Sequence, residues 1–156
     1  MKLGISGSRD IGDFDFREYF LLKNLNFRKF ANTLGKESIT AIITGGARGI
    51  DTIAENAANM LQISTIVFHP DFEKFHGKLR FAAFLARNEE ILCNCDALLA
   101  VWNGNKNSHG TLYTINAAIE DKKPVFLIIV NNNMVQFQGI QNELIDYPNR
   151  KRWNKV

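Results

Sequence analysis

Short apolar runs alternate with longer segments of helical periodicity along most of the chain. The apolar runs predict strands at residues 2–6, 39–44, 65–68, 97–102 and 124–130. The periodic segments predict helices at residues 16–34, 51–61, 81–92 and 111–120. Strands that are apolar throughout and alternate with helices are typical of a parallel sheet buried on both faces. We therefore expect an α/β fold, with a doubly wound, mainly parallel five-stranded sheet and helices on both faces.

The chain after the fifth expected strand has a different character. Three consecutive asparagines at 131–133 predict a turn, and residues 134–147 are consistent with an edge strand followed by a short helix. We expect residues 1–130 to form a nucleotide-binding domain and residues 131–156 to be a C-terminal extension, packed on that domain or trailing from it. The basic run at 150–155 is expected to be a solvated tail, with a contact to a phosphate backbone as the alternative.

Composition narrows the class of protein without identifying a ligand. The 156 residues suffice for one domain, and 19 basic against 16 acidic residues give a net charge of +3, too small to indicate nucleic-acid binding by itself. Cys93 and Cys95 are not spaced as a zinc-binding pair, and no second pair completes a site, so we expect no metal. The absence of a signal-peptide pattern and of a run of membrane-spanning length predicts a cytoplasmic protein without membrane contact.

The most informative segment is Thr-Gly-Gly-Ala-Arg-Gly-Ile-Asp, between the second expected strand and the second expected helix. Gly45, Gly46 and Gly49 would let the backbone approach a phosphate, at a helix N-terminus whose N–H groups and dipole favour an anion. Arg48 is suited to bidentate contact with a phosphate. The structural alternative for the glycines is a turn with close packing between strand and helix. Asp51 is expected to be the acid of the first helical turn and to cap exposed N–H groups rather than to bind a ribose.

Two further turns follow expected strands and carry small, polar or basic residues. Their ligand-binding candidates are Gly7, Ser8, Arg9, Asn103, Gly104, Ser108, Gly110 and Thr111. The first turn could contact a phosphate or a ribose, or could be a small-residue turn with a solvated arginine. The second turn could be another anion-binding loop, or its Ser108 or Thr111 could cap the following helix.

Candidate catalytic side chains are few. Asp71 follows the third expected strand, where it could bind ribose hydroxyls, activate water, or complete a turn around the neighbouring proline. Arg87 and Asn88 on the third expected helix could face a ligand, whereas a salt bridge between Arg87 and Glu90 is the structural alternative. Three scattered histidines without a carboxylate cluster predict no metal site.

All of these turns follow strands, and the carboxyl ends of parallel strands lie at one edge of a sheet, where doubly wound folds bind their ligands. We therefore expect a nucleotide-like ligand between the two glycine-containing segments, with no further cofactor required. The chain lacks both the Gly-x-Gly-x-x-Gly pattern of dinucleotide-binding folds and the Lys-Ser/Thr ending of a P-loop. Ordinary NAD-dependent chemistry and ATPase chemistry therefore lose support.

The order and spacing of these segments resemble the SLOG superfamily, a Rossmann-like group that includes the lonely-guy phosphoribohydrolases and DNA-processing protein A. The matching segments are 7–9, 44–51, 69–75, 87–90 and 102–111. The similarity spans residues 2–130 and is greatest to the small stand-alone bacterial and phage proteins related to YspA and YpsA. The resemblance implies a Rossmann-like fold that binds a nucleotide-derived ligand at the two glycine segments.

The same resemblance bears on catalysis. In the phosphoribohydrolases an arginine and a glutamate carry the cleavage of an N-glycosidic bond. Arg87 occupies the place of that arginine, but Thr114 stands where the glutamate would be. A carboxylate there would stabilise an oxocarbenium-like centre or position water, so its absence weakens the hydrolase interpretation. The candidates to replace it are Asp71 and Glu90.

Our leading hypothesis is thus a binding module that senses or sequesters a nucleotide or nucleotide-sugar derivative. One alternative is an enzyme that cleaves an N-glycosidic or phosphoribosyl bond. Another is binding of single-stranded DNA, which would need a basic groove and aromatic stacking platforms and which we do not expect. A homo-oligomer formed through the apolar surface of helix 16–34 or 81–92 stays open. Removing residues 150–156 is expected to leave ligand binding intact, because they follow the last core strand.

Overall fold

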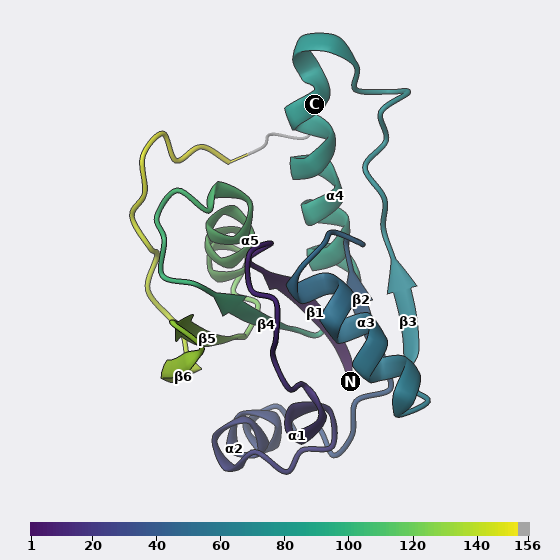
Figure 1. The fold of residues 1–156 in the computed structure, drawn as a ribbon, viewed down its shortest axis with the longest axis vertical. Coiled ribbons are helices and arrows are strands. Elements are labelled where there is room, and N and C mark those ends of the chain that lie inside the picture. The colour runs from purple at the N-terminus through teal and green to yellow at the C-terminus, as the bar shows by residue number, and fades with distance from the viewer. Residues whose placement is uncertain (153–156) are drawn as a thin grey trace.

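Six strands form one sheet in the computed structural model, which describes residues 1–152 (Figure 1). The strands are β1 (Lys2–Gly7), β2 (Ala41–Thr44), β3 (Ser64–Val67), β4 (Ala97–Trp102), β5 (Val125–Asn131) and β6 (Met134–Ile140). Their order in the sheet is β3-β2-β1-β4-β5-β6, and β1 to β5 are parallel. The chain therefore winds outward from β1 in both directions, and the point of reversal lies between β1 and β4.

The sixth strand, β6, pairs antiparallel with β5, so the expectation of five strands is wrong by one. The turn expected at 131–133 is confirmed. Asn132 and Asn133 have φ angles of 51° and 61°, which suit a two-residue hairpin turn and which asparagine tolerates. The expected edge strand after this turn is β6. No helix follows it in the described part of the chain, so that expectation is wrong.

Helices cover both faces of the sheet, as expected. One face carries α1 (Arg17–Phe20), α2 (Leu25–Thr33) and α3 (Ile50–Met60), and the other carries α4 (Arg80–Asn94), preceded by the 3₁₀ turn η1 (Gly77–Leu79), and α5 (His109–Glu120). The alternation of side chains along each strand divides the core between these faces. Along β4, Leu99 and Val101 pack with the first group, whereas Leu98 and Ala100 pack with the second. Burial on both faces explains why this strand is apolar throughout.

The single helix expected at 16–34 is wrong, because the chain breaks between α1 and α2. Leu22 has a φ of 53°, a left-handed conformation that interrupts a helix, and the N–H of Asn24 donates back to the carbonyl oxygen of Glu18. The Asn24 side chain then caps α2 by accepting the N–H of Phe27 at 3.0 Å. Both short helices can therefore turn aromatic side chains into the core, which one continuous helix would not orient in this way.

The amino-terminal part of α4 extends beyond the carboxyl ends of the strands and forms a wall above them (Figure 1). The loop that leads into it from β3 extends to the same height. Within residues 1–152, no helix combines the length and the apolar character needed to span a bilayer.

Residues 141–152, called the C-terminal segment below, run from β6 back across α5 towards α4 (Figure 1). Arg150 and Lys151 are exposed, as expected of a solvated tail. Arg152, in contrast, forms ion pairs with three acidic side chains on α4 and at the end of α5. The expectation of a solvated tail is therefore wrong at Arg152, and the rest of that expectation falls on residues 153–156, outside the described residues.

Candidate functional site

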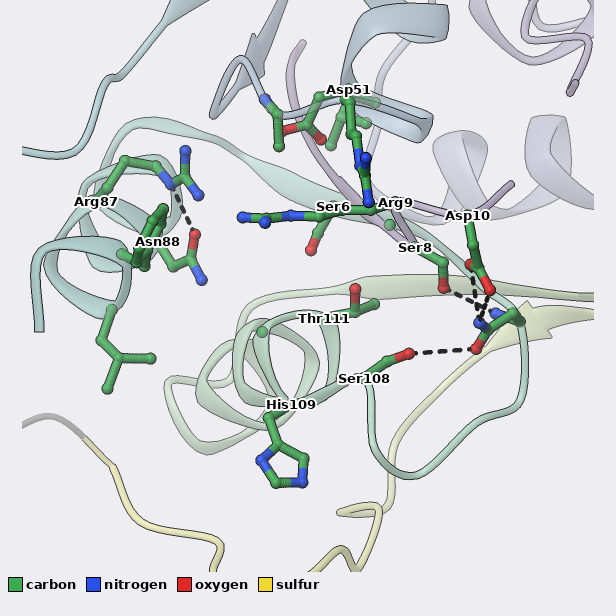
Figure 2. Close-up of a pocket in the computed structure, with 18 of the residues that line it drawn as sticks. Ser6, Ser8, Arg9, Asp10, Asp51, Arg87, Asn88, Ser108, His109 and Thr111 are labelled. Atoms are coloured by element: carbon green, nitrogen blue, oxygen red, sulfur yellow. Dashed lines mark hydrogen bonds between the residues drawn. The ribbon is translucent and has the colours of Figure 1, made fainter. Parts of the chain in front are cut away.

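A cavity of about 580 Å³ opens at the carboxyl ends of β1 and β4, where the winding of the sheet reverses (Figure 2). Its walls come from the loop after β1, the N-terminus of α3, one side of α4 and the loop between β4 and α5. The predicted ligand-binding residues that line it are Gly7, Ser8, Arg9, Arg48, Arg87, Asn88, Asn103, Ser108, Gly110 and Thr111. Those that do not line it are Gly45, Gly46, Gly49, Asp71 and Gly104.

The three glycines before α3 make close contacts within the protein. A Cβ at Gly45 would lie 2.3 Å from the Nη1 of Arg87, so the missing side chain leaves room for that guanidinium. Gly46 has a φ of 66°. Gly49 has a φ of 84°, and a Cβ there would lie 2.6 Å from carbonyl oxygens of the loop after β1. These contacts agree with the close-packing alternative, and a direct contact of these glycines with a phosphate stays a prediction.

Asp51 is buried at the start of α3 and fixes the loop before it. Its Oδ2 accepts the backbone N–H groups of Gly45 at 3.2 Å and Ala47 at 3.1 Å. Asp51 therefore lies in the first turn of α3 and caps N–H groups, as expected, and the amides that it caps belong to the loop before the helix. Burial raises the pKa of Asp51 to about 6, although the two backbone hydrogen bonds and the nearby Arg87 oppose this increase.

Arg87 is buried in the wall of the cavity and is held by two hydrogen bonds. Its Nε donates to the Oδ1 of Asn88 at 2.9 Å, and its Nη1 donates to the carbonyl oxygen of Gly45. Burial lowers the pKa of Arg87; the carboxylate of Asp51 opposes this decrease, and the positive charge of Arg9 adds to it. The guanidinium is thus fixed in place by the protein before any ligand binds.

The other two predicted catalytic candidates lie outside the cavity. Asp71 is exposed in the loop after β3, where its Oδ1 accepts two backbone N–H groups of that loop at 3.1 and 2.9 Å. Glu90 is exposed on α4, and in the described part of the chain it forms no salt bridge with Arg87. The carboxylates that do line the cavity are Asp10 and Asp51. No group of three or more His, Cys, Asp or Glu side chains among residues 1–152 is placed to bind a metal ion.

Hydrogen bonds between polar side chains join the loop after β1 to the loop after β4. Ser8 Oγ accepts the backbone N–H of Asn103 at 3.0 Å, and Asn103 Nδ2 donates to both carboxylate oxygens of Asp10 at 2.9 and 3.0 Å (Figure 2). Ser108 Oγ donates to Asn103 Oδ1 at 3.3 Å. The Ser108 side chain makes no hydrogen bond that caps α5, which was one of its two expected roles. The network instead fixes the rim of the cavity.

One side of the cavity is rich in hydrogen-bond donors. The backbone N–H groups of Gly110 and Thr111, in the first turn of α5, have no acceptor among the described residues. A Cβ at Gly110 would meet nothing within 4 Å, so the space before this helix terminus is open. Arg9 extends across the cavity towards Arg87, and their guanidinium carbons lie 5.6 and 5.9 Å from the ring centroid of Phe84 (Figure 2). Two positive charges therefore converge near a free helix N-terminus.

Sequence reasoning missed the apolar side of the cavity. Phe81, Phe84 and Leu85 line it from α4. Their spacing places them on the same side of the helix as Arg87 and Asn88, so helical periodicity could have grouped them with those two candidates. Other lining residues that were not predicted include Ser6, Asp10, Asn105 and Asn107.

Comparison with known proteins bears on the fold. No protein-family model and no curated protein matches the sequence. Among solved structures, the chain is similar to the X-ray structure of DNA processing protein A from Streptococcus pneumoniae, with a TM-score of 0.55 and 22% sequence identity. The fold is Rossmann-like. The match covers 81% of this chain and 49% of that chain, so this chain spans about half the length of that structure.

The similarity confirms the coarser part of the fold expectation, an α/β fold with a mostly parallel sheet like that of DNA processing protein A. At this level of identity the comparison concerns the fold alone. Assignment to the stand-alone proteins related to YspA and YpsA stays a prediction.

Proposed function

We propose that the cavity binds a phosphate-bearing nucleotide derivative. The observation that carries this proposal is the convergence of the Arg9 and Arg87 side chains near the free N–H groups of Gly110 and Thr111. A phosphate between them would accept charge-assisted hydrogen bonds from arginine and from the helix N-terminus, and would relieve the repulsion between the two guanidinium groups.

The remaining walls suit the sugar and the base. Phe81 offers an aromatic ring against which a base can stack, and the hydroxyl groups of Ser6 and Thr111 can form hydrogen bonds with a ribose. The volume of about 580 Å³ falls within the range of small-molecule sites, about 300–1,000 Å³. An anion-binding side and an aromatic side in one cavity together favour a nucleotide over inorganic phosphate alone.

We propose binding without cleavage. Thr114, at the place of the glutamate of the phosphoribohydrolases, is buried and its hydroxyl donates to the carbonyl oxygen of Gly110 at 3.0 Å. Asp10 and Asp51, the carboxylates of the cavity, both already accept hydrogen bonds from the protein. In both cases these bonds fix a loop of the protein, so each carboxylate has a structural role that does not require catalysis.

Prolonged incubation with nucleoside monophosphates should therefore release no free base above the protein-free control. Chromatography of the reaction mixture measures this directly. Base release by the wild-type protein that disappears in the Arg87→Ala variant would contradict the proposal of binding alone.

Arg9→Ala and Arg48→Ala should each weaken nucleotide binding by about 1.5–3 kcal/mol, the contribution of a hydrogen bond to a charged group. Both side chains line the cavity, whereas Arg28 is exposed on α2 and does not line it. Arg28→Ala removes the same charge and should leave affinity unchanged. Native mass spectrometry of freshly purified protein would identify a co-purifying nucleotide, and calorimetry against a panel of nucleotides would measure the affinities.

The same titrations distinguish nucleotide binding from the alternative, binding of single-stranded DNA. This alternative is tested because the similar solved structure is of a protein named as a DNA processing protein. Each DNA phosphate neutralised by the protein releases counterions, so DNA binding weakens steeply with salt, whereas a single nucleotide should show moderate salt dependence. Failure of every nucleotide in the panel to bind, together with tight binding of a DNA oligonucleotide at physiological salt, would contradict the proposed ligand class.

A further inference from the structure

The C-terminal segment runs past α5 (Figure 1). It is attached to this helix at two points that the proposed function does not use. The side-chain amide of Asn116 makes two hydrogen bonds with the backbone of Ile145, donating to its carbonyl oxygen at 2.7 Å and accepting its N–H at 2.8 Å. Tyr147 is buried, and its ring centroid lies 5.4 Å from that of His109 at the start of α5. Ile145 and Tyr147, which follow the last strand, are thus part of the packed structure.

Arg152 makes a third attachment, and this one joins α5 to α4. Its Nη1 and Nη2 donate to the two carboxylate oxygens of Asp121, just beyond α5, at 2.8 and 2.6 Å. Its Nε and Nη2 also donate to the two carboxylate oxygens of Glu89 on α4, both at 3.3 Å. The planar guanidinium, with its several donors, can therefore hold carboxylates from both helices at once.

The contact between Arg152 and Glu89 matters because Glu89 is a buried carboxylate. Its side chain is only 5% exposed, and its Oε1 also accepts the hydroxyl of Tyr113 on α5 at 2.5 Å. A carboxylate buried between two helices is unfavourable without a counter-charge, and Arg152 is the cation that pairs with it among the described residues. Loss of Arg152 would leave an uncompensated charge between α4 and α5.

Two of the three attachments, those at Glu89 and His109, lie next to the cavity in sequence. Glu89 directly follows Asn88, and His109 directly precedes Gly110, and both of these neighbours line the cavity. We propose that the C-terminal segment is a clamp that fixes α4 against α5, with Arg152 acting as a positioning residue for the ligand site. This inference rests on the proposed function, because the clamp sets the distance between the α4 side and the α5 side of that cavity.

The clamp makes two properties of the protein reciprocal. A ligand that bridges α4 and α5 shifts the equilibrium towards the clamped arrangement by some factor. Loss of the clamp lowers the affinity for that ligand by the same factor. Removal of residues 150–156, expected from the sequence to leave binding intact, should therefore weaken binding, because it removes Arg152.

Arg152→Gln tests the clamp, with Lys151→Gln as the matched control, since Lys151 is exposed and its replacement removes the same charge. Hydrogen–deuterium exchange of the ligand-free proteins measures how strongly the clamp protects the backbone amides of α4. Peptides that cover residues 87–92 should exchange at least fivefold faster in Arg152→Gln and unchanged in Lys151→Gln. Calorimetry with adenosine 5′-monophosphate as the probe should show about tenfold weaker binding in Arg152→Gln only.

The double variant Glu89→Gln/Arg152→Gln removes the buried charge together with its partner, so it should fold even if Arg152→Gln does not, and should recover part of the protection from exchange. If exchange is unchanged in Arg152→Gln and in the double variant, the clamp is overturned, whether or not the probe binds. Faster exchange with unchanged affinity would overturn the positioning role. If wild-type protein fails to bind any nucleotide, the proposed function fails, and the exchange result alone decides the clamp.

Discussion

Gly49→Ala is expected to destabilise the protein by about 4 kcal/mol, from backbone strain and overpacking together. Gly49 has a φ of 84° and a ψ of −127°, a conformation that residues with a Cβ rarely adopt. The added Cβ would also lie 2.6 Å from the carbonyl oxygens of Ser8 and Arg9. Because these are backbone atoms, the loop after β1 would have to move as a whole. Urea denaturation measures the change in the free energy of unfolding.

Gly110→Ala is the matched control for this experiment. A Cβ at Gly110 would meet nothing within 4 Å, and the residue lies in α5, where alanine is favoured over glycine by up to about 1 kcal/mol. The control should therefore be as stable as the wild-type protein or slightly more stable. A loss of less than about 1 kcal/mol in Gly49→Ala would show that the N-terminus of α3 does not pack closely on the loop after β1.

The stability of the protein relative to its Asp51→Asn variant should fall by about 3 kcal/mol as pH rises from about 4 to about 6. Burial raises the pKa of Asp51 in the folded protein to about 6, from an ordinary value of 3.8. Between these two values the folded state holds a proton that the unfolded state has lost, so stability decreases with pH across this window and levels off above it. A difference of about 2 pKa units corresponds to about 3 kcal/mol.

Urea denaturation of both proteins at intervals between pH 4 and pH 7 gives this difference directly. Asp71→Asn serves as the control for the loss of one carboxylate that accepts two backbone N–H groups, because Asp71 makes similar bonds in an exposed loop. Parallel curves for the wild-type protein and Asp51→Asn across this range would contradict the buried environment assigned to Asp51.

The parts of the fold that the sequence predicted correctly are those whose pattern is local and strong. β4 is buried on both faces and forms one apolar run in the sequence. The glycine segment before α3 marks where that helix begins. The break between α1 and α2 was missed because the apolar spacing of residues 16–34 continues across it, while Leu22 turns left-handed and Asn24 caps a new helix. Periodicity does not detect such a break when the residues on both sides face the same core.

The candidate site was predicted through topology more than through motif. Ser8, Arg9 and Asn103 were grouped because they follow parallel strands, and the structure places them on one cavity. The glycines before α3 were predicted as contacts for a phosphate, yet Gly45 and Gly49 pack against Arg87 and the loop after β1. A glycine that makes room for a ligand and one that makes room for another part of the chain look the same in sequence.

The sequence by itself determined the five parallel strands and, to within one residue, where each of them ends. It therefore also determined which turns share one edge of the sheet, because these properties depend on local patterns of apolar and polar residues. Only the tertiary structure decided which partner each polar residue meets. Arg87 donates to the carbonyl oxygen of Gly45, 42 positions away, and Arg152 pairs with Glu89, 63 positions away. Such contacts depend on the packing of whole helices against the sheet and against each other, which no local pattern encodes.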